Sequence, residues 1–189
     1  MDDFEEIEGL KQGNERSFHK LLDIYSENIY NLCLSFLQNQ EDAEDATQEV
    51  FSTVFLSIKE FKGESKLSTW MFRITVNKCQ EHIRKKNRKK RFGFLSSIEN
   101  SENAQLSPSF LHPGAELENK ERASILFSAI DRLPENQKIA FTLHKIEGIA
   151  YEDVAIAMNL SLSSVESLMF RAKQNLKKSL GDYYEKNER

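Results

Sequence analysis

Long segments with apolar residues at every third or fourth position, and few residues that break helices, constrain this chain most. Only seven glycines and three prolines occur in 189 residues. An apolar repeat of about 3.6 residues is typical of amphipathic helices, and no strand pattern of useful length competes with it. The sequence therefore predicts an all-α fold. Helices are expected at residues 15–38, 42–60, 69–90, 119–132, 135–146, 151–158 and 162–180.

One segment lacks this periodicity and divides the chain. Residues 92–118 hold two of the three prolines, several serines and no basic residue, a composition typical of a flexible linker. The length of the chain suits two small helical domains, each with a modest core. We predict a first domain at 1–91, a linker at 92–118, a second domain at 119–182 and a polar tail at 183–189.

Charge is strongly segregated along the chain, although the net charge is only −4. Residues 1–60 carry 14 acidic and 4 basic side chains, whereas residues 61–91 carry 11 basic and 2 acidic ones. Such polarity is informative about partners rather than about the fold. An acidic helix followed by a basic one predicts two partners, which are a positively charged protein and a nucleic acid.

The residue patterns of several other classes of protein are missing. Cys33 and Cys79 form no CxxC pair and are expected to be buried thiols. The histidines show no metal-ligand spacing and no nucleophile–base pattern, so we expect no metal, no cofactor and no enzymatic activity. Neither a signal peptide nor a stably inserted membrane span is expected, which predicts a cytoplasmic protein. The four histidines are His19, His82, His112 and His144.

The helix expected at 42–60 has two distinct faces. Apolar residues from Ala43 to Ile58 recur every three or four positions and form a core stripe. The second face is acidic and lies near the positive end of the helix dipole. It is either a solvated surface or a docking site for a basic helix, and the charge pattern alone favours the first by about two to one. Its residues are Asp42, Asp45, Gln48, Glu49 and Ser52.

The loop at 61–70 and the following helix combine basic, small polar and aromatic residues. Arginines along one face can follow phosphates, amide side chains can read base edges, and small polar groups beside aromatic rings suit an unstacked base. Alternatively, Phe61 and Trp70 anchor the loop in the core and the basic run at 84–91 only solubilises the helix. The combination favours nucleic acid. The polar residues are Lys62, Ser65, Lys66, Ser68, Thr69, Arg73, Asn77, Gln80, Arg84 and Arg88.

The second domain contains two helices separated by a short break. Asn159 tolerates the left-handed conformation that ends a helix, and Ser161 is a natural N-cap for the next one. This is a helix-turn-helix signature, whose second helix enters the major groove of DNA. The alternative is a helical hairpin used only for packing. The residues expected to face DNA are Ser161, Ser163, Ser164, Glu166, Ser167, Phe170, Arg171, Lys173 and Gln174.

These motifs, in this order and spacing, resemble bacterial RNA polymerase sigma factors of the extracytoplasmic-function type. The string at 42–51 resembles the family's segment that docks on the clamp helices of the largest polymerase subunit. The pattern Phe61-x-Gly-x-Ser-x-x-x-Thr-Trp-x-x-Arg-Ile-x-x-Asn77 resembles its promoter-melting and −10 segment. Motifs at 133–137, 147–155 and 164–173 resemble its −35-binding domain, and the resemblance covers about residues 17–91 and 119–180.

The resemblance implies a promoter-specificity subunit made of a sigma region 2 helical bundle and a sigma region 4 helix-turn-helix. It implies binding to core RNA polymerase through the clamp helices and the flap, binding to promoter DNA, and melting by capture of a flipped −10 base. It adds Phe51 to the polymerase-docking set and Trp70 to the −10 set. Members of the family are commonly held by an anti-sigma factor, which is a further candidate partner. The rival from the residues alone is a stand-alone helix-turn-helix transcriptional regulator.

Three positions depart from the family pattern. Glu81 stands where the family often has Asp, which keeps the charge. Glu166 and Leu168 stand where Lys and Arg are frequent, which leaves the −35 sequence open. Glu166 either accepts from a cytosine amino group or complements the helix N-terminus. Phe170, which the helical repeat places on the exposed side, meets either a thymine methyl or the polymerase.

Overall fold

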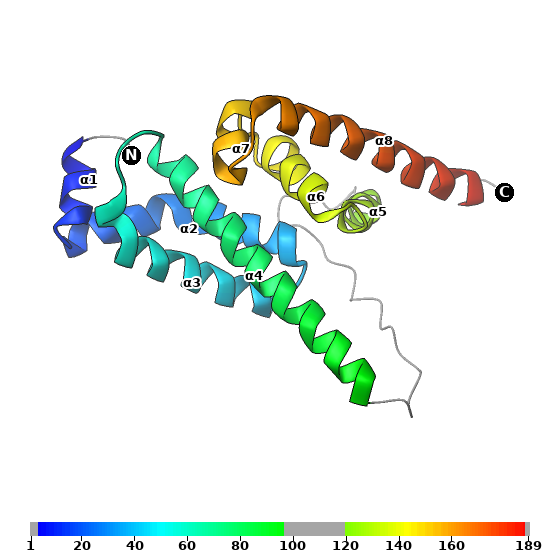
Figure 1. Ribbon diagram of the computed structural model, residues 1–189, viewed down its shortest axis with the longest axis horizontal. Coiled ribbons are helices and arrows are strands. Elements are labelled where there is room, and N and C mark those ends of the chain that lie inside the picture. Colours follow the sequence, from blue (N-terminus) through cyan, green and yellow to red (C-terminus); the bar gives the residue numbers. More distant parts are fainter. Residues whose placement is uncertain (1–3, 97–119, 188–189) are drawn as a thin grey trace.

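The computed structural model describes residues 4–96 and 120–187, and every regular element in these two segments is a helix (Figure 1). The predicted all-α fold is therefore confirmed. Most of the predicted linker, residues 97–118, lies outside the described residues, and the predicted domain limits stay a prediction. The elements are α1 (Phe4–Lys11), α2 (Glu15–Leu37), α3 (Gln40–Ser57), the 3₁₀ helix η1 (Ile58–Glu60), α4 (Leu67–Ser96), α5 (Lys120–Asp131), α6 (Glu135–Phe141), the π-helical turn η3 (Thr142–Ile146), α7 (Tyr151–Met158) and α8 (Leu162–Asn187).

Three features of these helices differ from the sequence prediction. Helix α1 was not expected, because eight residues offer too few repeats for a periodic signal, and short helices depend on tertiary packing. Its Leu10 is buried against the core. Helix α4 continues to Ser96 and α8 to Asn187, past the predicted ends at 90 and 180. Both extensions contain a residue of good intrinsic helix propensity, Arg91 in α4 and Lys186 in α8.

Helices α2, α3 and α4 form a bundle whose entry points are fixed by side-chain caps. The Asn14 Oδ1 accepts hydrogen bonds from the backbone N–H groups of Arg16 at 2.9 Å and Ser17 at 3.3 Å, and so caps α2. At the other end of α2, Gln38 adopts a left-handed φ of 49°, which turns the chain back into α3. The predicted core stripe of α3 is confirmed, because each of its five residues is buried. These are Ala43, Ala46, Val50, Val54 and Ile58.

Cys33 of α2 and Cys79 of α4 meet inside this bundle as free, buried thiols, as predicted. The hydrogen bond to Cys33, together with burial, raises the pKa of Cys79 well above its ordinary value. The Cys79 thiol is therefore protonated at neutral pH, and the pair acts as part of the core.

The second group of helices builds the predicted helix-turn-helix from α7 and α8. Asn159 ends α7 with a left-handed φ of 54°. The Ser161 Oγ then accepts a hydrogen bond from the backbone N–H of Ser164 at 3.2 Å, which confirms the predicted N-cap. The inner face of α8 is buried against α5, α6 and α7. Its buried residues include Val165, Met169, Ala172 and Leu176.

The loop that leads into α7 is held by an aromatic contact and a hydrogen bond. The rings of His144 and Tyr151 stack with their centroids 4.3 Å apart. The His144 Nδ1 lies 2.8 Å from the carbonyl oxygen of Ile149, within hydrogen-bond distance. Gly148 bridges these residues with a φ of 70°, a conformation that side chains with a Cβ rarely adopt. The entry angle of α7 is fixed by these local contacts.

Candidate functional site

The predicted polymerase-docking face on α3 borders an apolar groove between α2 and α3. The groove has a volume of about 530 Å³. Phe55, which lines the groove, is 51% exposed, and the next residue of α3, Leu56, is 76% exposed. Asp45, Gln48 and Ser52 of the predicted set are also exposed. The residues that line the groove are Phe18, Leu22, Ser26, Thr47, Gln48, Phe51, Ser52 and Phe55.

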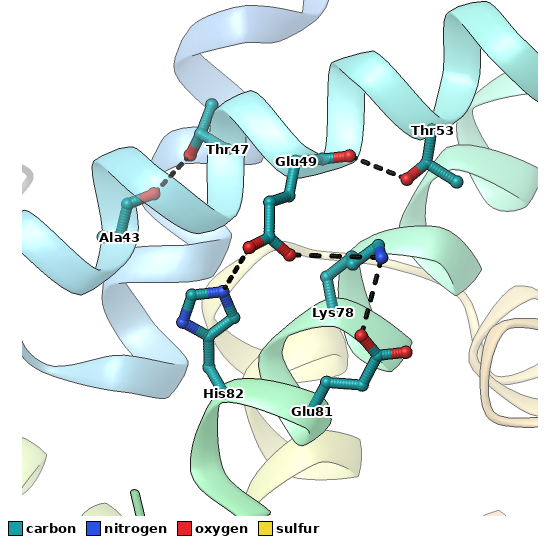
Figure 2. A network of polar contacts seen from close by, with 7 residues as sticks. All are labelled: Ala43, Thr47, Glu49, Thr53, Lys78, Glu81 and His82. Carbon is teal, nitrogen blue, oxygen red and sulfur yellow. Dashed lines mark hydrogen bonds and ion pairs between the residues drawn. The ribbon is translucent and has the colours of Figure 1, made fainter. Parts of the chain in front are cut away.

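Two acidic residues of that predicted set are paired with the basic helix α4. Figure 2 shows Glu49 of α3 between Lys78 and His82, with Oε2 4.0 Å from Lys78 Nζ and Oε1 3.3 Å from His82 Nε2. The buried His82 Nε2 has no hydrogen-bond partner, so its contact with Glu49 is ionic only when the imidazole is protonated. Asp42 pairs with Lys86 at 2.9 Å. Two carboxylates of the acidic face therefore neutralise basic side chains of α4 within the same molecule.

Phe51 occupies a different position from the rest of the predicted docking set. Its side chain is only 7% exposed and belongs to the core of the bundle. One side of the residue still lines the groove. Phe51 forms part of the floor of the groove, and exposed neighbours such as Phe55 would contact a docked partner.

Sequence reasoning did not include Phe18, Leu22 or Phe55 among the candidate site residues. Phe18 and Phe55 meet edge to face with their ring centroids 5.1 Å apart, so α2 contributes to the same surface as α3. A signal was present in the sequence, because Phe55 and Leu56 are large apolar residues outside the core stripe of α3. Exposed apolar clusters of this kind mark interaction sites.

The predicted −10 residues follow one side of the loop at 61–70 and of α4. Phe61 is 4% exposed, and its ring packs on Trp70 with centroids 5.4 Å apart, so the core-anchor alternative holds for Phe61. Trp70 is half-buried against the same core. Thr69, by contrast, is 2% exposed. The other residues of the set are half-buried or exposed, and they are Lys62, Ser65, Lys66, Arg73, Asn77, Gln80, Arg84 and Arg88.

Helix α7 lies against this same side of α4. The Thr69 hydroxyl donates a hydrogen bond to Asp153 Oδ1 of α7 at 2.9 Å. Farther along α4, a pocket of about 270 Å³ separates α4 from the end of α7. Its walls include Arg73, Asn77 and Gln80 from α4. The remaining wall residues are Val76, Asn136, Ala157, Met158, Asn159 and Leu160.

The predicted −35 residues lie together on the outer face of α8. Phe170 is 64% exposed, and Glu166 and Arg171 are exposed on the same helix. Ser161 has a structural role as well, because its hydroxyl caps α8 and lies 2.7 Å from that of Ser164. Apart from the half-buried Ser164, the whole set is exposed, namely Ser161, Ser163, Glu166, Ser167, Phe170, Arg171, Lys173 and Gln174.

Two kinds of feature are absent from the described parts of the chain, a cluster of metal-ligating side chains and a membrane-spanning helix. Between residues 4–96 and 120–187, no three potential metal-ligating side chains gather into one group. Within the same residues, no helix combines the length and the apolar character needed to cross a bilayer.

Comparison with known proteins identifies the family. The sigma-70 region 2 family model matches residues 21–89, and the sigma-70 region 4 model matches residues 123–176. The ECF RNA polymerase sigma-E factor of Haemophilus influenzae is 30% identical over 177 residues, which cover 92% of this chain and 93% of that protein. The chain belongs to the extracytoplasmic-function group of the sigma-70 family. The RNA polymerase sigma-H factor of Pseudomonas aeruginosa is 29% identical over 181 residues, or 92% of this chain and 91% of that protein.

Solved structures show the same fold. The sigma factor RpoE in complex with the anti-sigma factor NepR from Bartonella quintana superposes with a TM-score of 0.69 at 21% identity, over 88% of this chain and 98% of that chain. CnrH in complex with the cytosolic domain of CnrY gives a TM-score of 0.69 at 20% identity, over 96% and 99% of the two chains. As a sigma factor the protein is a transcription initiation factor and not an enzyme. A stand-alone regulator would leave the region 2 match unexplained.

Proposed function

We propose that this sigma factor docks on core RNA polymerase through α3 and the α2–α3 groove, and binds the −35 duplex with α8. We further propose that the loop at 61–70 and the outer side of α4 capture an extruded −10 base. The protein would act in the cytoplasm, where the polymerase works. An anti-sigma factor and the polymerase flap are further proposed partners, on the resemblance stated above.

The coexistence of two different surfaces on one chain carries this proposal. The α3 surface joins exposed acidic and polar side chains to an apolar groove, which suits an amphipathic partner helix with a basic edge. The α8 surface is polar and exposed, which suits the major groove. A protein that only binds duplex DNA needs the second surface and has no use for the first.

The proposed −10 chemistry relies on groups that suit a single strand. Extruding a base costs about a few kcal/mol, and stacking and hydrogen bonds in a pocket can offset that cost. The exposed Lys62 and the half-buried Ser65 lie in the loop before α4, and the half-buried Trp70 lies in the first turn of α4, so a cation, a hydroxyl and an aromatic ring follow one another closely along the chain. Arg84 and Arg88 are exposed farther along α4 and would follow the backbone phosphates.

The docking proposal is tested best at Asp45. Charge reversal at Glu49 or Asp42 would also break the pairs with α4, so a loss of polymerase binding there would have two explanations. Asp45 is exposed on α3. We expect Asp45→Lys to weaken binding to core polymerase by at least about tenfold, the range seen for charge pairs at interfaces.

The matched control is Glu5→Lys, which makes the same charge change at an exposed position of α1, outside the predicted face. Fluorescence anisotropy with labelled full-length protein and core polymerase gives the affinities, and circular dichroism verifies that both variants are folded. Equal affinity of the two variants for core polymerase would refute the docking assignment. Run-off transcription with the wild-type holoenzyme should, in addition, yield discrete start sites that need the sigma factor.

A further inference from the structure

Helix α8 carries one carboxylate on the surface that is proposed to face DNA. Between Leu162 and Gly181, Glu166 is the only acidic residue. Its side chain is exposed, and α8 forms the upper edge of the molecule in Figure 1. The other polar members of the proposed −35 set are serine, arginine, lysine and glutamine, which all carry N–H or O–H donors. Glu166 is therefore an acceptor that cannot donate, on a surface rich in donors.

Capping does not explain Glu166, because Ser161 already caps the N-terminal end of α8. The Ser161 Oγ accepts a hydrogen bond from the backbone N–H of Ser164 at 3.2 Å. Helix α8 begins at Leu162, so Glu166 is its fifth residue, and no acidic residue lies in its first turn. The helix dipole favours a negative charge chiefly within the first turn. The position of Glu166 therefore does not support a role in complementing the helix N-terminus.

An ion pair does not explain Glu166 either. Side chains three and four positions apart meet on a helix surface. None of the residues at these distances from Glu166 carries a positive charge, and they are Leu162, Ser163, Met169 and Phe170. Among the described residues, the Glu166 carboxylate has no hydrogen-bond or ion-pair partner. Its oxygens are thus free to accept hydrogen bonds from a ligand of α8.

Glu166 lies in the part of α8 that would read bases. Recognition helices contact base edges with their N-terminal residues. With a rise of 1.5 Å per residue, Glu166 lies about 6 Å along the axis from the first residue of α8. The exposed Lys173 and Lys177 follow on the same side of the helix, about two and three turns farther along, where they would bind phosphates. The carboxylate would then lie in the groove while the two cations hold the DNA backbone.

A carboxylate in the major groove can pair only with an amino group of a base. It accepts hydrogen bonds but cannot donate them, and the surrounding phosphates repel it. The donors that the bases present in this groove are N4 of cytosine and N6 of adenine. The adenine N6 lies beside the acceptor N7, which repels a carboxylate and suits an amide. The cytosine N4 lies beside a C5–H group, so cytosine is the base that suits Glu166.

We propose that Glu166 determines part of the −35 sequence by accepting a hydrogen bond from the N4 amino group of one cytosine. The proposal rests on the proposed binding of α8 to the −35 duplex. At a base pair that offers no suitable amino group, the carboxylate stays unpaired among phosphates. Glu166 therefore also rejects duplexes that lack the cytosine. One good base contact of this kind discriminates by about tenfold in affinity.

The first test asks which base each variant selects. The −35 positions of a promoter found by run-off transcription are randomised, and the duplexes that bind the holoenzyme are sequenced for wild type, Glu166→Gln and Glu166→Ala. Wild type should enrich cytosine at one position. Glu166→Gln should enrich adenine there, because an amide accepts from N6 and donates to N7, and Glu166→Ala should show no preference there. The preferences at all other positions should be the same for the three proteins.

The matched control is Glu135→Gln, which removes the same charge from an exposed position of α6 outside the −35 set. It should select the same bases as wild type, and circular dichroism verifies that every variant is folded. If Glu166 acted only through its charge, Glu166→Gln would bind all duplexes more tightly and would leave the base preferences unchanged. That outcome would overturn the proposal.

A second test removes the amino group from the DNA and leaves the rest of the base in place. The selected cytosine is replaced by 2-pyrimidinone, in which a hydrogen atom stands for the N4 amino group. We expect the wild-type holoenzyme to lose about tenfold more affinity than Glu166→Ala on this replacement. Comparison of the two proteins cancels the weaker pairing of the modified base, which is the same for both. Equal losses for the two proteins would refute the contact.

Failure of the proposed −35 function would give a different result. If the wild-type holoenzyme enriches no sequence at the randomised positions, the assignment of α8 to the −35 duplex fails, and the role of Glu166 fails with it. If wild type enriches a −35 sequence that is the same for Glu166→Ala, the assignment of α8 stands and the role of Glu166 alone is refuted.

Discussion

Glu147 makes the stability of this fold depend on pH. It lies between η3 and α7, and its Oε1 is buried without a hydrogen-bond partner. Burial raises the pKa of Glu147 from its ordinary 4.5 to about 7. Because the pKa is higher in the folded state, the folded chain keeps a proton that the unfolded chain has released. The contribution of Glu147 to the free energy of unfolding is fully present below about pH 4.5 and is lost as the pH rises through about 7.

The size of the effect follows from the two pKa values. Each unit of pKa difference between the folded and unfolded states corresponds to about 1.4 kcal/mol in the free energy of unfolding. The difference between 4.5 and about 7 therefore sets an upper limit of about 3.4 kcal/mol on the contribution of Glu147. Glu147 is only half-buried, and solvent screening reduces this to about 1–2 kcal/mol. Glu147→Gln keeps the shape and removes the ionisation. We expect this variant to be more stable than wild type by about 1–2 kcal/mol above pH 7 and equally stable near pH 4.5.

Urea unfolding followed by circular dichroism, repeated at several pH values, measures this difference. Glu152→Gln is the control, since Glu152 is exposed and lies five residues farther along the chain. It should show the same pH dependence as wild type. A stability difference between wild type and Glu147→Gln that does not change with pH would show that burial of the carboxyl is not its cause.

Two further predictions concern packing and backbone conformation. Asn159→Val should lower the free energy of unfolding by about 1–2 kcal/mol, because a β-branched residue is strained at a φ of 54°. Asn159→Gly should lower it only slightly. Thermal unfolding of the two variants measures the difference, and equal losses of stability would contradict the prediction. Met169→Ala should lower the free energy of unfolding by about 2–5 kcal/mol, because it opens a cavity at a side chain that is 1% exposed. The urea midpoint should shift accordingly, whereas Ser167→Ala, at an exposed position of the same helix, should leave the midpoint unchanged.

The parts of the fold that were predictable depend on short-range signals. The apolar repeat placed α3 and its core stripe correctly, and the pair Asn159 and Ser161 marked the break between α7 and α8. Each of these signals acts within a few residues, so no knowledge of tertiary contacts is needed. The same reasoning explains why α1 was missed, since its stability depends on tertiary packing against α2 and η1, where Leu10 joins the core.

The candidate site was only partly predictable, because neighbouring helices change the role of a charge. The repeat placed Asp42 and Glu49 on an outer face of α3, but it contained no information that α4 packs beside that face. Lys86 and Lys78 then use these carboxylates as intramolecular partners. Lys138 shows the same limit, because a lysine in a sequence is expected outside, yet here it is 7% exposed and held by two oxygens.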